Sequence, residues 1–72
     1  MLAAIMRTPQ QYETFELSKD LNSAIKKGMH GVILEILNSN SFEVEFVNED
    51  GTNIEFDSTA TFTIDSSYLK KD

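Results

Sequence analysis

GVILEILNSNSFEVEFVNEDGTNIEFD, residues 31–57, is the stretch that decides the expected fold. It contains three runs rich in β-branched, aliphatic and aromatic residues: VILEIL (32–37), FEVEFV (42–47) and NIEF (53–56). Such runs are typical of β-strands, and the Asn, Ser, Asp and Gly residues between them are typical of turns. The stretch therefore predicts a three-stranded antiparallel meander.

The flanking sequence predicts further pairing segments and one helical turn. Residues 12–17 predict a first strand, 59–64 a further pairing segment and 68–70 a last short strand. In the long connection 18–28, Leu21, Ala24 and Ile25 are spaced as on a single helical turn, which the run Lys26-Lys27-Gly28 would end. The expected fold is all-β, a small partly open barrel of five strands with one helical turn in the first long loop.

Alternation along the strands predicts the register. A three-residue loop at 39–41 places Ile36 opposite Val44, and a three-residue loop at 49–51 places Phe46 opposite Ile54, so that apolar residues face one another. The inner face then carries Val32, Leu34, Ile36, Val44, Phe46, Ile54 and Phe56. The outer face carries Ile33, Glu35, Leu37, Glu43, Glu45, Val47, Glu55 and Asp57.

The acidic residues of this outer face form the candidate site. Glu35, Glu45 and Glu55 are expected in a row across three strands, with Glu43 opposite Asp57. Opposed like charges on a sheet are unfavourable, which favours a second role for them. The row could be a docking face for a basic protein, with apolar anchors at its edges, or a solvated face that keeps a small domain soluble. The expected anchors are Ile33, Leu37 and Val47.

Length and composition limit the function. The chain has 72 residues, 12 Asp and Glu against 6 Lys and Arg, a formal net charge of −6 and no Cys. We expect one domain over residues 12–72 after a loose leader over 1–11, too small for the cleft of most enzymes. The acidic balance disfavours nucleic acid and membrane surfaces, and the absence of Cys fits a cytoplasmic location.

Catalytic and metal chemistry finds little support in the sequence. His30 is the single histidine, so neither a zinc site nor a Cys/His nucleophile can be assembled. Glutamates on an open sheet lack the enclosing oxygen ligands that calcium requires. We therefore expect no enzyme activity, metal or cofactor.

Several short motifs resemble a known family. These are Lys27-Gly28, Gly31 before VILEI (32–36), FEVEF (42–46), Asp50-Gly51 and the spacing from Ile64 to Leu69. Over residues 12–69 they resemble the small bacterial proteins of domain-of-unknown-function family 4926 and, more loosely, KOW, Tudor and other SH3-like barrels. The resemblance implies a five-stranded SH3-like fold, and the family brings no established activity with it.

The expected function is a non-enzymatic protein-binding module, an antitoxin-like or immunity-like accessory protein whose acidic face binds a basic partner. Two alternatives stay open. One is a KOW-like or Tudor-like nucleic-acid-binding barrel that uses Lys26, Lys27, Tyr12 and Tyr68. The other is a homodimeric structural module that pairs through exposed strand edges.

Overall fold

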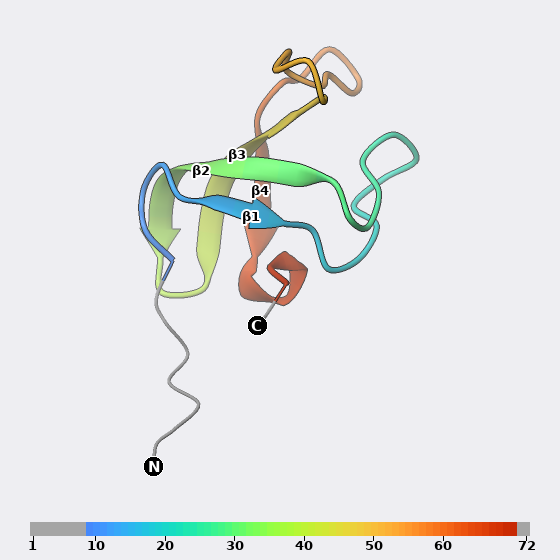
Figure 1. Ribbon diagram of the computed structural model, residues 1–72. Helices are drawn as coiled ribbons and strands as arrows, with labels where there is room; N and C mark the ends of the chain where they lie inside the picture. The colour runs from blue at the N-terminus through green and yellow to red at the C-terminus, as the bar shows by residue number, and fades with distance from the viewer. Residues whose placement is uncertain (1–8, 71–72) are drawn as a thin grey trace.

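The computed structural model describes residues 9–70 and shows an antiparallel sheet of four strands in the order β1-β2-β3-β4, followed by a short 3-10 turn (Figure 1). The elements are β1 (Thr14–Glu16), β2 (His30–Asn38), β3 (Ser41–Val47), β4 (Phe62–Asp65) and η1 (Ser66–Tyr68). The predicted all-β class is confirmed. Residues 1–8 of the predicted leader lie outside the described residues.

Two predicted strands are reduced to single bridges. The segment after β3 pairs only through Val47 with Asn53, where the nitrogen of Ile54 donates to the oxygen of Phe46 at 2.9 Å. This pairing has the predicted register, but it extends no further. At the end of the described chain, Leu69 forms one bridge with Leu17, so the sheet is not closed by a full fifth strand.

The predicted helical turn in the first long loop is wrong. Side-chain oxygens organise this loop instead: Asn22 Oδ1 accepts from the backbone nitrogens of Ala24 and Ile25 at 2.9 and 2.8 Å, and Asp20 Oδ1 accepts from that of Lys27 at 2.8 Å. Asn and Asp side chains commonly satisfy nearby backbone donors in this way, in competition with helix. The loop thereby brings Ile25 into the core, fully buried.

The register of β2 against β3 differs from the prediction. Ile33 lies opposite Val44, Glu35 opposite Glu43, and Asn38 opposite Ser41, with register shifts between these pairs. The shifts leave Leu34 and Leu37 as extra residues on β2, the arrangement of β-bulges. Because each extra residue reverses the alternation, the predicted faces of β2 are inverted around Ile33.

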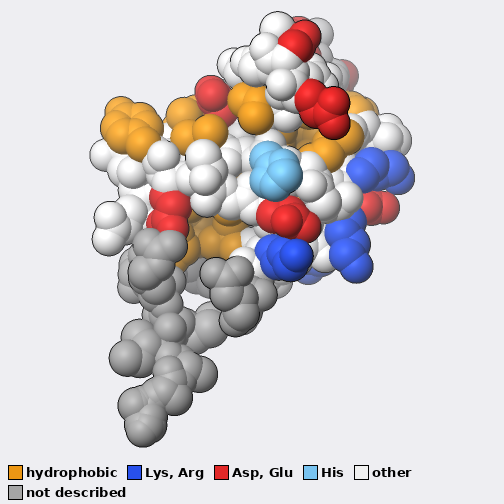
Figure 2. All heavy atoms as spheres, viewed as in Figure 1, with side chains coloured by type: hydrophobic (Ala, Val, Ile, Leu, Met, Phe, Trp, Pro, Cys, Tyr) orange, Lys and Arg blue, Asp and Glu red, His pale blue; other side chains and the backbone are white. Residues whose placement is uncertain are grey.

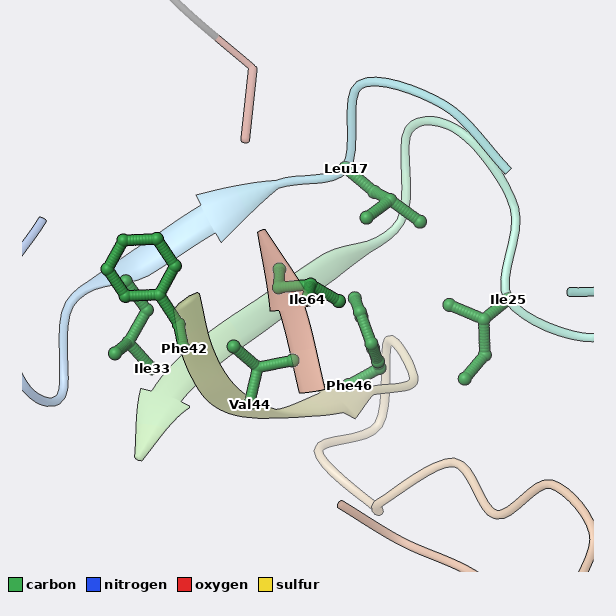
Figure 3. Close-up of a cluster of buried hydrophobic side chains, with 7 residues drawn as sticks. All are labelled: Leu17, Ile25, Ile33, Phe42, Val44, Phe46 and Ile64. Atoms are coloured by element: carbon green, nitrogen blue, oxygen red, sulfur yellow. The ribbon is translucent and has the colours of Figure 1, made fainter. Parts of the chain in front are cut away.

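The core lies between the curved sheet and the loops that cross it, and consists of seven buried hydrophobic side chains (Figure 3). They are Leu17, Ile25, Ile33, Phe42, Val44, Phe46 and Ile64. Val44 and Phe46 were predicted here, and both are confirmed. Ile36 was also predicted here; it lies opposite the core residue Phe42 but is 40% exposed.

A glycine in β2 allows the aromatic part of this core to form. Gly31 lies opposite Phe15 on one side and Phe46 on the other, and the two rings meet edge to face with centroids 5.7 Å apart. A Cβ atom on Gly31 would lie 2.7 Å from the backbone oxygen of Glu45 and 2.7 Å from the ring of Phe15. The ring of Phe15 thus occupies the space that a side chain at Gly31 would need.

The loop after β3 extends away from the sheet and ends in a tight turn (Figure 1). Phe56 and Thr59 exchange backbone hydrogen bonds of 2.9 and 3.0 Å, and Asp57 and Ser58 between them have φ of 55° and 64°. Two consecutive left-handed residues define a type I′ turn, which favours Gly at the second position.

Replacing Ser58 with glycine is expected to stabilise the protein by about 1 kcal/mol, because glycine adopts positive φ without the steric cost that serine carries. Ser39→Gly is the matched control, since the β2–β3 turn that contains Ser39 has no positive φ. Urea unfolding of both variants tests this. Equal effects of the two substitutions would contradict it.

Three aspartates accept hydrogen bonds within turns, and their pKa values are lowered. Hydrogen bonds from the hydroxyl and backbone nitrogen of Ser67 lower the pKa of Asp65. The hydroxyl and backbone nitrogen of Thr52 lower the pKa of Asp50 in the same way. A hydrogen bond from the backbone nitrogen of Lys27 lowers the pKa of Asp20. A carboxyl with a lowered folded pKa binds its proton less readily in the folded state than in the unfolded state. It therefore contributes stability above its ordinary pKa and loses it as pH falls through the folded pKa.

We expect the free energy of unfolding to decrease below about pH 4 in part through these groups. The variant Asp65→Ala should lose less stability on acidification than the wild type, because its cap on η1 is already absent at neutral pH. Urea unfolding at a series of pH values measures this. A variant with the wild-type pH dependence would show that Asp65 makes no contribution.

Candidate docking surface

The outer face of the sheet carries a cluster of three carboxylates at its centre. Glu35 of β2 and Glu43 of β3 are direct partners, and Thr63 of β4 lies beyond Glu43. Glu45 is two residues further along β3 and so points to the same face. We call Glu35, Glu43 and Glu45 the acidic face; Glu35 is exposed, and the other two are half-buried among their neighbours.

No lysine, arginine or histidine of residues 9–70 forms an ion pair with the acidic face. The ion pairs lie elsewhere: Lys70 Nζ is 3.4 Å from Glu16, His30 Nε2 is 3.9 Å from the same carboxylate, and Lys26 Nζ is 3.4 Å from Asp20. Figure 2 shows lysines and carboxylates intermixed on one side of the molecule, below and beside the histidine. Cations are therefore gathered near the end of β1.

The structure brings together part of the predicted site. Glu35, Glu43 and Glu45 share one face as predicted, although Glu35 lies opposite Glu43 and not in a row with Glu45. Glu55 is exposed but lies beyond the bridge at Asn53, outside any strand, so its predicted place in the row is wrong. The predicted pairing of Glu43 with Asp57 is also wrong, since Thr63 occupies that position.

The predicted apolar anchors divide between core and surface. Ile33 is 1% exposed and belongs to the core, so its predicted place on the outer face is wrong. Leu37 is 44% exposed near the end of β2, and Val47 is half-buried at the other end of the β2–β3 pair, opposite His30. Ile36, predicted as core, is the exposed neighbour of Leu37.

Sequence reasoning missed a strained aromatic residue beside this surface. Tyr12 is 69% exposed, has φ of 67°, and donates its backbone N–H to the oxygen of Ile33 at 2.6 Å. The nitrogen of Ile33 donates in turn to the oxygen of Glu13, so two residues of the first segment face one of β2, as in a bulge. Nothing in the residue types around Tyr12 signals such a bulge, because positive φ normally selects Gly or Asn.

Residues of the alternative nucleic-acid surface do not gather in one place. Tyr12 and Lys27 lie beyond opposite ends of β1, since Tyr12 bonds to Ile33 while Gly28, next to Lys27, bonds to Leu17. The ring of Tyr68 is covered by Lys19, whose Nζ lies 4.5 Å from the ring centroid. No concave strip of lysines and tyrosines forms within residues 9–70.

We also considered pockets, metal-binding clusters and membrane-spanning helices in the described part of the chain. A shallow hollow is lined by Gly28, Met29, His30, Val47, Asn48, Glu49 and Ile54. Within residues 9–70 no group of three or more His, Cys, Asp or Glu residues is placed to hold a metal ion. None of the helical structure in this range is long and apolar enough to cross a membrane.

The fold and this surface define a small all-β protein with an acidic sheet face. The chain belongs to the family described as Domain of unknown function (DUF4926), whose model matches residues 11–71. The searches of curated proteins and of solved structures gave no match.

Proposed function

We propose that the protein is a non-enzymatic binding module whose acidic face binds a basic partner protein. The observation that carries this proposal is the direct opposition of Glu35 and Glu43, with Glu45 beside them and no cation of the described residues paired to any of the three. Opposed like charges cost a few tenths of a kcal/mol up to about 1 kcal/mol per pair. A partner that supplies Lys or Arg removes this repulsion on binding.

In this proposal the carboxylates and the nearby apolar residues have different roles. Surface charges of one sign accelerate encounter with an oppositely charged protein and orient it. Apolar contact at the centre of an interface supplies most of the affinity. In this proposal Leu37 and Val47 provide the apolar contact, and the acidic face provides the orientation.

The finer fold assignment is part of the same proposal. We infer that the sheet is an SH3-like barrel with a shortened fifth strand, which is represented by the single bridge between Leu17 and Leu69. The strand order and the 3-10 turn directly before Leu69 support this. The biological role proposed is that of a cytoplasmic antitoxin-like or immunity-like accessory protein that occupies the basic surface of its partner.

Charge-neutral variants test the binding proposal. The triple variant Glu35→Gln, Glu43→Gln, Glu45→Gln removes the acidic face, and Glu49→Gln, Glu55→Gln, Asp57→Asn removes the same charge from the loop after β3. The tagged proteins are expressed in the native host, the co-purifying protein is identified, and its affinity is measured by calorimetry. We expect at least about a hundredfold weaker binding for the first variant and little change for the second.

Equal affinity of both variants would overturn the proposal, because the position of the charges would then be irrelevant. Stability provides an independent readout. Glu43→Gln alone should raise the free energy of unfolding by a few tenths of a kcal/mol at low salt, since it removes the repulsion from Glu35. Urea unfolding at low and high salt measures this difference, which should diminish as salt screens the charges.

A further inference from the structure

We propose that the partner binds the acidic face with an extended segment that pairs along β2 from Leu34 to Asn38, on the edge that no strand of residues 9–70 pairs with. The segment would carry alternating aliphatic and basic side chains. This inference rests on the proposed function and specifies its binding mode, the addition of a strand to an exposed sheet edge.

The edge of β2 that faces β1 is paired over less than half of its length. β1 pairs with His30, Gly31 and Val32, and Ile33 bonds to Tyr12 and Glu13. The preceding chain then turns, with the nitrogen of Glu13 bonded to the oxygen of Gln10 at 3.1 Å. Beyond that point the side-chain amide of Gln11 reaches the oxygen of Leu34 at 3.0 Å, and no strand of residues 9–70 pairs with this edge from Leu34 to Asn38.

Apolar side chains flank this open edge. Ile36 and Leu37 are 40% and 44% exposed; Ile36 lies opposite the core residue Phe42, and Leu37 is the extra residue of the second bulge. Tyr12, 69% exposed, stands where the edge begins. A strand added here would gain backbone hydrogen bonds and could cover Ile36 and Leu37 with alternate side chains.

Charge determines which strand fits. Glu35 lies within the open edge and opposite Glu43 of β3, so an added strand would place its side chains next to Glu35, with Glu43 one strand further into the sheet. A second copy of this chain carries a net charge of −6 and brings its own Glu35 to the same edge, which opposes self-pairing. A segment with Lys or Arg at alternate positions meets the carboxylates with opposite charge.

Two synthetic peptides of opposite charge test this inference. One is acetyl-Lys-Val-Lys-Val-Lys-Val-Lys-amide, and the other has Glu in place of each Lys. Each is added at millimolar concentration to the isotope-labelled full chain, and amide hydrogen exchange is followed by NMR. We expect the basic peptide to slow exchange by about tenfold for those backbone amides of Leu34–Asn38 that point away from β3, and the acidic peptide to leave their exchange unchanged. Glu35→Lys should reverse this preference, whereas Glu55→Lys, the same charge change outside the edge, should keep it.

Four outcomes would overturn edge pairing. Two are an unchanged exchange rate with the basic peptide, and slowing by both peptides alike. The third is slow exchange, in the free chain at low concentration, of the amides that point away from β3, which would assign the edge to another segment of the chain. The fourth is slowing that grows with protein concentration, which would assign it to a second copy. If the triple acidic-face variant loses its partner while the partner leaves these amides in fast exchange, the proposed function stands and edge pairing fails.

Discussion

Replacing Gly31 with alanine is expected to destabilise the fold by about 3 kcal/mol, close to the upper end of the usual cost of overpacking. The added methyl group would lie 2.7 Å from the backbone oxygen of Glu45, and a backbone atom in the middle of a paired strand cannot move away without breaking the register. The ring of Phe15 would also have to leave its edge-to-face contact with Phe46. Urea unfolding followed by circular dichroism measures the change.

Gly28→Ala is the matched control for this prediction. A Cβ atom on Gly28 would meet nothing within 4 Å, but φ at this position is +93°, so the cost is backbone strain alone. That cost is about 1 kcal/mol. If Gly28→Ala proved as harmful as Gly31→Ala, the close packing at Gly31 would not be what requires glycine there.

Truncating Phe46 to alanine is expected to cost about 3–5 kcal/mol. Phe46 is fully buried, and its ring lies 5.7 Å from those of both Phe15 and Phe62, so its removal leaves a cavity between β1, β3 and β4. Because small domains have free energies of unfolding near the low end of about 5–15 kcal/mol, the variant should be largely unfolded at physiological temperature. Circular dichroism measures the loss of structure, through the temperature of thermal unfolding and through the near-ultraviolet signal, which the variant should lack.

Phe46→Leu keeps most of the side-chain volume and should remain folded with a smaller loss of stability. The contrast between the two substitutions separates cavity formation from the loss of aromatic contacts. A Phe46→Ala variant that unfolds at the wild-type temperature would show that the core rearranges to fill the space.

The strand that sequence reasoning placed best is β3. FEVEF (42–46) alternates strictly between apolar and acidic residues, so only one choice of faces buries the apolar set, and Phe42, Val44 and Phe46 are all buried. In VILEIL both faces are apolar over most of the run, and two bulges shift its phase. Bulges leave no mark in this run of aliphatic residues, which is why Ile33 was predicted on the surface.

The loops were harder to predict because side chains and tertiary contacts decide them. The residues of 18–28 fit one helical turn by spacing, yet Asp20 and Asn22 satisfy backbone donors that a helix would have used. The predicted strand 53–56 and β4 compete for the same edge of β3. β4 pairs with this edge from Ser41 to Val44, so that only the end of β3 remains for Asn53. Such competition between distant segments is not encoded in local periodicity.

The candidate site was predictable where it depended on β3 alone. Glu43 and Glu45 follow from the alternation of that strand, and Glu35 joins them because the bulge moves it opposite Glu43. Glu55 was placed by extending a hairpin that stops at Asn53. The positive φ of Tyr12 and the exposure of Ile36, which flank the open edge of β2, did not follow from the sequence, although both residues were considered for other roles.

The bridge between Leu17 and Leu69 has a kinetic consequence. The β2–β3 hairpin joins neighbouring segments and can form early, whereas this bridge must close a loop of most of the described chain, which slows its formation. We expect substitutions at Leu69 to accelerate unfolding with little effect on the folding rate, as for contacts formed after the transition state. During synthesis, β1 would then stay without its last neighbour until Leu69 has left the ribosome, so folding of this small domain is completed only after nearly all of its residues have been released.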